Sequence, residues 1–438
     1  MTSWWAGVRA RVPRIEFERG PAHAPSAVTT YYLIVVPALL LAAIGLLMGF
    51  SASAVTTITA GRSPYVEFLK PAGIIVFSLL VASAVQLVPE GRWYRTCGVI
   101  FVVALFVQSL VLTPLGLEVG GNRNWLVVPG IPVQLQPSEF VKLALVLALA
   151  RVVTRRGARI GDLGQIAATA GALMALAIGF VMLGQDMGTA IIVAAAGFGV
   201  LLVAGVPGKW FAWLGIAAVP VLAFLVVKNP TRLARVLAIL PGGSQSTTNL
   251  SAPTQIDHAL WALGSGGLTG LGPGASREKW NYLQAANTDF VFAIIGEEFG
   301  LLGTLTVIVC LGLLVWGMAR VAQNHATAFG RAVGGGVATW IAVQGLINVA
   351  SVTGMGPVIG VPLPLVSYGG SSFLFTATAV AVVASLARSD AGMRLIGQPD
   401  EASAGRDPRR APRRRRARPG AGPVTTTTAG QSIREARR

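Results

Sequence analysis

Residues 31–50 read YYLIVVPALLLAAIGLLMGF and contain no charged side chain. An α-helix rises about 1.5 Å per residue, so a helix of this length crosses the roughly 30 Å of hydrocarbon in a bilayer. Two further stretches, residues 97–116 and 301–317, are also free of charge and long enough to span. These blocks predict a chain that crosses a membrane repeatedly as helices.

The composition of the whole chain agrees with this class. Of the 438 residues, 53% are hydrophobic and only 12% are charged, whereas about a quarter of the residues of a soluble domain are charged. The two cysteines, Cys97 and Cys310, lie within apolar stretches, so no disulfide framework is expected. Residues 1–30 are polar and lead directly into a full-length span, which argues against a cleavable signal peptide.

The hydropathy pattern predicts an all-α integral membrane protein with about ten transmembrane helices and a large outer loop between the seventh and the eighth. We divide the chain into a cytoplasmic N-terminal segment at 1–30, a membrane domain at 31–388 with an extracytoplasmic loop at 228–288, and a cytoplasmic tail at 389–438. The predicted spans lie at about 31–52, 71–89, 96–115, 138–153, 163–184, 187–205, 209–227, 290–319, 332–352 and 371–388.

The net charge of +17 is unevenly distributed. Thirteen of the 35 Lys and Arg residues follow Leu386 in a stretch rich in Pro, Gly, Ala and Thr. This pattern predicts a disordered basic tail and argues against a folded surface for nucleic acid. With both termini in the cytoplasm, 26 cations lie inside and eight lie in the outer segments. The positive-inside rule therefore favours cytoplasmic termini.

The loop at 228–288 contains the glycine-dense run GSGGLTGLGPG at 264–274, together with Trp261, Trp280 and Leu283. Long loops in compact proteins are usually either functional or disordered. Because this one keeps aromatic and apolar residues, we expect it to be ordered and functional.

Ionisable residues within the spans are informative, because each costs at least about 2.5–3.5 kcal/mol at mid-membrane. Glu139 and Lys142 lie three residues apart in QPSEFVK at 136–142, so both side chains share one helix face. One interpretation is an intrahelical ion pair that lets both charges enter the membrane. The other, compatible with the first, is that the pair lines a cavity for a polar headgroup.

Further carboxylates lie at the outer ends of two spans and, at Glu297 and Glu298, about two turns deeper in the eighth span. Asp186 stands at the junction of the fifth and sixth spans, where it suits a helix N-cap. Asp289 begins the eighth span directly after the outer loop. Thr288 or Asp289 is a candidate cap for that helix, but a carboxylate at this junction is also placed to act as a general base on an interfacial substrate. Glu297 and Glu298 are adjacent and cannot share a helix face, so at least one needs an interior partner.

Residues 354–372 read GMGPVIGVPLPLVSYGGSS, in which the prolines and glycines exclude a continuous helix. Irregular backbone at membrane depth persists only where it is buried in protein or lines a wet cavity. This segment, which includes Ser367 and Tyr368, is therefore a site candidate.

Taken in order, these segments resemble the SEDS family (shape, elongation, division and sporulation) of FtsW- and RodA-type proteins. The resemblance covers residues 31–388 and does not extend into the tail. The chain departs from the family pattern at Asn287, where His is usual, at Asn124, and at Gln185, where Pro is usual. The motifs are SAS at 51–53, GNRNW at 121–125, QPSEFVK at 136–142, QDMGT at 185–189, ALGSGG at 262–267, NTDF at 287–290, GEE at 296–298 and PLPLVSYGGSS at 362–372.

The resemblance implies a peptidoglycan glycosyltransferase that polymerises lipid II into β-1,4 glycan strands and releases undecaprenyl pyrophosphate with inversion. Such chemistry needs a base for the attacking hydroxyl and positive charge for the departing pyrophosphate. Asp289 matches the catalytic base. The residues expected to bind substrate are Arg123, Glu139, Lys142, Gln185, Asp186, Ser367 and Tyr368. No cofactor or metal ligand is identified, and a divalent cation is compatible with the chemistry.

Within the family, the segments at 61–65 and 68–70 and the basic tail favour the division-type (FtsW-like) branch over the elongation-type (RodA-like) branch. The expected partners are a class B penicillin-binding protein transpeptidase and other division proteins, at the division septum of the plasma membrane. Two other functions are compatible with a buried Glu–Lys pair and interrupted helices. One is a lipid II flippase, and the other is a catalytically inactive scaffold that activates a transpeptidase. The clustering of Asp289, the long loop and the Pro/Gly-rich segment at the outer face favours the polymerase over the flippase. The scaffold differs from the polymerase in that it would tolerate the loss of Asp289.

Overall fold

The computed structural model describes residues 26–59, 61, 63–119, 122–127, 134–155, 162–228, 233, 254–280, 283 and 288–392. All of them belong to one compact unit, Met1–Arg394. The predicted tail from residue 393 onward, most of the N-terminal segment and parts of the outer loop lie outside the described residues.

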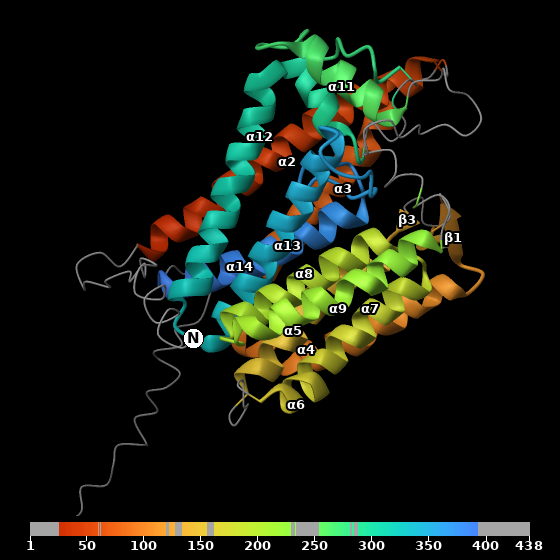
Figure 1. The fold of residues 1–438 in the computed structure, drawn as a ribbon. Coiled ribbons are helices and arrows are strands. Elements are labelled where there is room, and N and C mark those ends of the chain that lie inside the picture. Colours follow the sequence, from red (N-terminus) through yellow and green to blue (C-terminus); the bar gives the residue numbers. More distant parts are fainter. Residues whose placement is uncertain are drawn as a thin grey trace, which may run out of the picture. The chain divides into compact units, whose positions relative to one another are not determined.

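Each of the ten predicted spans coincides with helix (Figure 1). The fifth combines α6 (Leu163–Ile166), a π-helical turn at Ala167–Gly171 and α7 (Ala172–Leu183). The other nine are α2 (Ala27–Thr59), α3 (Pro64–Val85), α4 (Glu90–Ser109), α5 (Pro137–Thr154), α8 (Met187–Val203), α9 (Gly208–Val227), α12 (Val291–Asn324), α13 (Ala328–Val352) and α14 (Ser371–Asp390).

Seven helices within the described residues are long and apolar enough to cross a membrane. The predicted class, an all-α integral membrane protein, is confirmed, and the count of ten spans stays a prediction. Of the three other predicted spans, α5 carries Glu139, Lys142 and Arg151, and α8 is apolar but only 17 residues long.

Two smaller elements lie in the predicted outer loops. After a 3-10 turn at Leu110–Leu112, strands β1 (Gly116–Val119), β2 (Asn122–Val127) and β3 (Gln134–Leu135) form an antiparallel sheet in the order β1-β2-β3. Gly116 pairs with Leu126, and Leu126 pairs with Leu135. In the long loop, α11 (Gln255–Gly266) begins with a capping box between Thr254 and Asp257.

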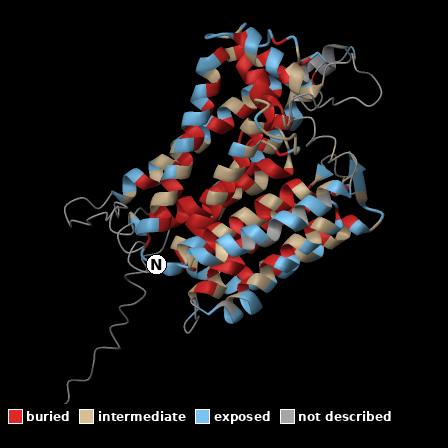
Figure 2. Cartoon of the chain, in the orientation of Figure 1, coloured by how far each residue is buried: buried red, intermediate tan, exposed pale blue. Residues whose placement is uncertain are grey.

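Helices α5, α13 and α14 form the centre of the unit, where Figure 2 shows the densest run of buried residues. Of the most apolar 18 residues of α14, 83% are buried, against 22% of the 18 residues Phe68–Val85 in α3. Helix α13 packs against α8, α12 and α5, while α14 packs against α3 and α2. The outer helices carry exposed apolar side chains such as Phe77, Val99 and Phe106, which suit contact with lipid.

Helix α12 is interrupted at Gly300, whose φ of 65° and ψ of −159° are not helical. The eighth span, predicted at 290–319, is therefore a helix with a break that the hydropathy pattern did not indicate. The glycine-dense run at 264–274 forms hydrogen bonds with the backbone at the break. Leu301 N donates to Gly267 O (2.9 Å), and Leu302 N donates to Leu268 O (3.2 Å). In return, the carbonyl oxygens of Glu297 and Glu298 accept from backbone N–H groups of the same run, those of Leu271 and Gly272. Backbone groups that the break releases are thus paired again, as a low-dielectric environment requires.

We expect Gly300→Ala to lower the free energy of unfolding of the solubilised protein by about 1–3 kcal/mol. This is the cost of holding a residue with a side chain in a sparsely populated backbone region. The added Cβ would also overlap with the backbone of Leu268 and Gly270. The matched control is Gly312→Ala in the same helix, where a Cβ meets nothing within 4 Å. Thermal unfolding in detergent compares the two variants, and equal melting temperatures would contradict the need for glycine at the break.

Candidate functional site

The irregular segment at 354–370 joins α13 to α14 and lies against the start of α8 and the turn at 288–290. A Cβ added to Gly188, in the first turn of α8, would overlap with Ile359. A Cβ added to Gly360, which has φ of 73°, would lie 3.4 Å from Asp289 Oδ2. The segment thus passes directly beside the Asp289 carboxylate.

A polar stripe on α13 holds this segment in place. Gln344 Nε2 donates to Pro362 O (2.8 Å), and Asn348 Nδ2 donates to Val361 O (2.7 Å). One turn further on, a serine hydroxyl donates to Pro357 O (2.8 Å). The stripe consists of Gln344, Asn348 and Ser351. These residues belong to none of the predicted motifs, although polar side chains at intervals of four and three in an apolar helix are a sequence signal for one polar face.

Asp289 lies in the turn that precedes α12. Asn348 Nδ2 donates to Asp289 O (2.7 Å), and Ser367 Oγ donates to Thr288 O (2.5 Å). The predicted cap formed by Thr288 or Asp289 is wrong, because the N-cap of α12 is Phe290 and no side chain caps the helix. The Asp289 carboxylate is therefore not used to stabilise the helix end.

Burial raises the pKa of Asp289 to about 6, against the ordinary value of 3.8. A hydrogen bond with Thr288 opposes the rise, and the negative charge of Asp186 adds to it. Asp289 as a whole residue is half-buried, so its carboxyl group is desolvated although the residue is not fully enclosed. That combination suits an acid–base group working near neutral pH.

Glu139 and Lys142 form a buried ion pair on α5. Lys142 Nζ lies 2.8 Å from both carboxylate oxygens of Glu139 and donates to Gln344 Oε1 (2.9 Å). It also lies 4.6 Å from the centroid of the Trp340 ring. Neither charged side chain is more than 2% exposed. These contacts favour the ion-pair interpretation, and through Gln344 they connect the pair to the segment at 354–370.

Asp186 is the N-cap of α8, as predicted: its Oδ1 accepts from Thr189 N (3.0 Å). Its Oδ2 accepts from Asn124 Nδ2 (2.8 Å) on β2 and from Gln136 Nε2 (3.1 Å) at the start of α5. The carboxylate thus joins three elements. Gln185, which precedes it, has an unusual φ of 59°.

The remaining predicted substrate-binding residues are Arg123 and Tyr368. The Arg123 guanidinium donates to Thr113 O (2.7 Å) and Gly116 O (3.4 Å), at the base of the small sheet. Tyr368 is half-buried and follows Ser367 in the irregular segment. The structure therefore connects Glu139, Lys142 and Ser367 to the surroundings of Asp289 by hydrogen bonds, whereas the guanidinium of Arg123 points toward other partners.

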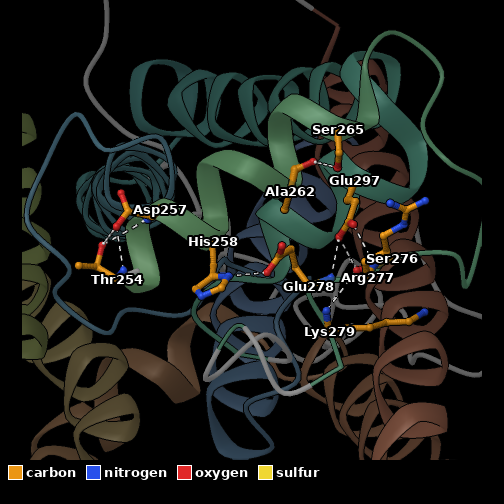
Figure 3. A network of polar contacts seen from close by, with 10 residues as sticks. All are labelled: Thr254, Asp257, His258, Ala262, Ser265, Ser276, Arg277, Glu278, Lys279 and Glu297. Carbon is orange, nitrogen blue, oxygen red and sulfur yellow. Dashed lines mark hydrogen bonds and ion pairs between the residues drawn. The ribbon is translucent and has the colours of Figure 1, made fainter. Parts of the chain in front are cut away.

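A second buried cluster anchors the outer loop to α12, and Figure 3 shows part of it. Glu297 accepts from Ser276 Oγ (2.5 Å) and from Arg277 N (2.8 Å). Glu298 Oε1 lies 2.8 Å from Lys279 Nζ. The same carboxylate oxygen accepts from a hydroxyl on α2, that of Ser51 (2.6 Å). Both acidic residues therefore find interior partners, as the sequence predicted for at least one of them.

Ion-binding groups are sparse in the part of the chain that the structure describes. There, no three or more His, Cys, Asp and Glu side chains gather in a way that could hold a metal ion. His258 Nδ1 lies 2.7 Å from a carboxylate oxygen of Glu278 in the loop (Figure 3).

Fold and site together define a multi-pass membrane protein with a carboxylate at the junction of an outer loop and a broken helix. Residues 31–391 match the FTSW_RODA_SPOVE family, described as cell cycle proteins. The chain belongs to this family, which confirms the resemblance drawn from the motifs.

Individual relatives agree with this assignment. The chain is 35% identical over 367 residues to the probable peptidoglycan glycosyltransferase FtsW of Thiomicrospira cyclica, covering 83% of this chain and 92% of that protein. It is 33% identical over 360 residues to stage V sporulation protein E of Bacillus subtilis, covering 81% and 96%.

Solved structures extend the comparison. The rod shape determining protein RodA of Thermus thermophilus has a TM-score of 0.58 at 27% identity, covering 80% of this chain and 96% of that one. A chain from a structure titled for the coordination of polymerization and crosslinking by a peptidoglycan synthase complex has a TM-score of 0.64 at 26% identity, covering 80% and 97%.

We expect Glu139→Gln and Lys142→Met each to destabilise the protein strongly, because removing one partner of a buried ion pair costs about 3–5 kcal/mol. The double variant Glu139→Gln/Lys142→Met leaves no unpaired charge and should be more stable than either single variant. Thermal unfolding in detergent measures all three. Two single variants as stable as the wild type would show that the pair does not support the fold.

Proposed function

We propose that this protein is a peptidoglycan glycosyltransferase that polymerises lipid II at the outer face of the plasma membrane, with Asp289 as its general base. The observation that carries the proposal is the state of Asp289. Its carboxylate caps no helix, the backbone carbonyls of residues 288 and 289 are held by Ser367 and Asn348, and burial raises its pKa to about 6. The names of the FtsW relatives support the same activity.

In the proposed reaction, the 4-hydroxyl of the acceptor's terminal sugar attacks the anomeric carbon of the donor. A new C–O bond forms with inversion as the bond from that carbon to the pyrophosphate breaks. Asp289 accepts the hydroxyl proton, and undecaprenyl pyrophosphate leaves with the electron pair. A base with a pKa near the working pH is mostly deprotonated and still basic enough to assist the attack.

The departing pyrophosphate needs positive charge. Lys142 is buried against Glu139 and Gln344, while Arg277 is an exposed cation of the outer loop. Among the described cations of the outer loop, Arg277 is thus a more accessible partner for the pyrophosphate than Lys142. We propose no resident cofactor, and a divalent cation would enter with the substrate's pyrophosphate.

We further propose that both termini are cytoplasmic, that the protein serves division at the septum, and that it acts with a class B penicillin-binding protein and other division proteins. The distribution of Lys and Arg supports the orientation. The similarity to a chain of a peptidoglycan synthase complex supports a crosslinking partner.

The deciding experiment incubates the purified protein, with and without a class B penicillin-binding protein, with labelled lipid II and analyses the products for polymer. Polymer that requires this chain supports the proposal. A flippase or a scaffold would move lipid II or activate the transpeptidase without making polymer itself.

We expect Asp289→Asn to reduce polymerisation by at least about 100-fold, because a general base contributes about 10²–10⁴-fold. Expression and membrane insertion should stay close to normal, since the side chain caps no helix. Asp257→Asn, which alters only the cap of α11, serves as the control for removing an outer-face carboxylate. A correctly inserted Asp289→Asn protein with wild-type polymerisation would remove Asp289 from the base role.

The rate of polymerisation should fall as the pH drops through about 6, because protonation removes the base form of Asp289. Below about pH 6 the rate should decrease about tenfold per pH unit. Above that value, the deprotonation of Asp289 should cause no further increase in the rate. Initial rates measured from about pH 5 to 8 test this. A rate that stays constant down to about pH 5 would be inconsistent with a base of this pKa.

A further inference from the structure

Asn348 lies at a point where two distant segments meet. It is 2% exposed, and its Nδ2 donates to Asp289 O and to Val361 O, both at 2.7 Å. The first carbonyl belongs to the turn before α12, and the second belongs to the irregular segment after α13. One amide group therefore bridges the two pieces of backbone that flank the Asp289 carboxylate.

The chemistry of this contact requires an amide N–H₂ group. Both neighbours are carbonyl oxygens, which only accept hydrogen bonds, and an amide nitrogen carries two protons. Asn348 uses one proton for each carbonyl, so its orientation is determined by its partners. A side chain of similar volume without donors would remove this partner from both carbonyls. The buried carbonyl of Val361 would then lose its hydrogen bond without gaining water.

The geometry around Asp289 depends on this bridge. Ser367 holds the preceding carbonyl, that of Thr288, so two consecutive peptide groups of the turn are fixed. On the other side, Val361 directly follows Gly360, whose Cα would direct a Cβ to within 3.4 Å of Asp289 Oδ2. Asn348 thus ties the backbone that carries the carboxylate to the backbone that passes beside it.

We propose that Asn348 is a positioning residue, which sets the carboxylate of Asp289 against the Gly360–Val361 backbone for proton transfer. This inference rests on the proposed function. Asn348 does not touch the reacting atoms, and it acts through the backbone of Asp289. Gln344, one turn earlier on α13, holds the next carbonyl, Pro362 O, and receives the ammonium of Lys142, so the buried ion pair supports the same arrangement.

The test compares Asn348→Leu, which keeps a similar volume without donors, with Asn348→Ala, which the core accommodates more readily if leucine prevents folding. The matched control is Ser351→Ala. Ser351 lies on the same stripe, and its hydroxyl contacts Pro357 O of the same segment and Ile347 O of its own helix. It separates a general loosening of the segment from the loss of the bridge.

Full-length proteins are purified in detergent and assayed with labelled lipid II and a class B penicillin-binding protein. We expect each Asn348 variant that folds to lose about 10- to 100-fold in kcat, the effect of a displacement of about 1 Å at a reacting group. KM for lipid II should change less than about threefold, because the substrate-binding side chains are unaltered. Ser351→Ala should keep kcat within about threefold of the wild type.

Two results would overturn the inference: a folded Asn348 variant with wild-type kcat, or an equal loss of kcat in Ser351→Ala. Asp289→Asn is assayed in parallel to separate this inference from the proposed function. An inactive Asp289→Asn protein beside fully active Asn348 variants refutes the positioning role alone. An active Asp289→Asn protein refutes the base assignment on which the positioning role rests.

Discussion

A backbone carbonyl or N–H group at membrane depth must find a partner within the protein, because hydrocarbon offers none and each unpaired group costs several kcal/mol. Among the residues that the structure describes, the break at Gly300 and the segment at 354–370 leave regular helix beside the buried core. The partners they recruit account for much of the polar structure. Backbone groups of the glycine-dense run pair with the break, and amide and hydroxyl side chains of α13 pair with the segment.

The pairing of these backbone groups also determines how the outer loop is attached to the helices. The run at 266–272 approaches α12 closely because glycines leave space: a Cβ on Gly266 would overlap with Gly296 O, and one on Gly270 would overlap with Glu298 O. The loop is fastened further by Lys279, whose ammonium reaches Glu298 and Ser51. The outer loop is thereby joined to α2 and α12.

Buried charge follows the same logic. Lys142 is tolerated because Glu139, Gln344 and the Trp340 ring replace its water shell. The amide nitrogen of Gln344 donates to Pro362 O. The Glu139–Lys142 ion pair therefore helps to support the irregular segment. The sequence suggested that Glu139 and Lys142 bind substrate. In the structure, the pair is connected through Gln344 to the backbone that surrounds Asp289.

The positions of the helices, the membrane class and the family were predictable from the sequence, because the hydropathy of stretches such as 31–50 and the order of short motifs are local properties of the chain. The N-cap role of Asp186 was predictable for the same reason, since its partner Thr189 is three residues away. Tertiary structure alone decided the break at Gly300, the attachment of the Arg123 guanidinium to Thr113 and Gly116, and the failure of Thr288 and Asp289 to cap α12. It also decided the bridge from Asn348 to Asp289 and Val361. These features depend on which carbonyls remain unpaired once distant segments pack together, and no local pattern of residue types records that.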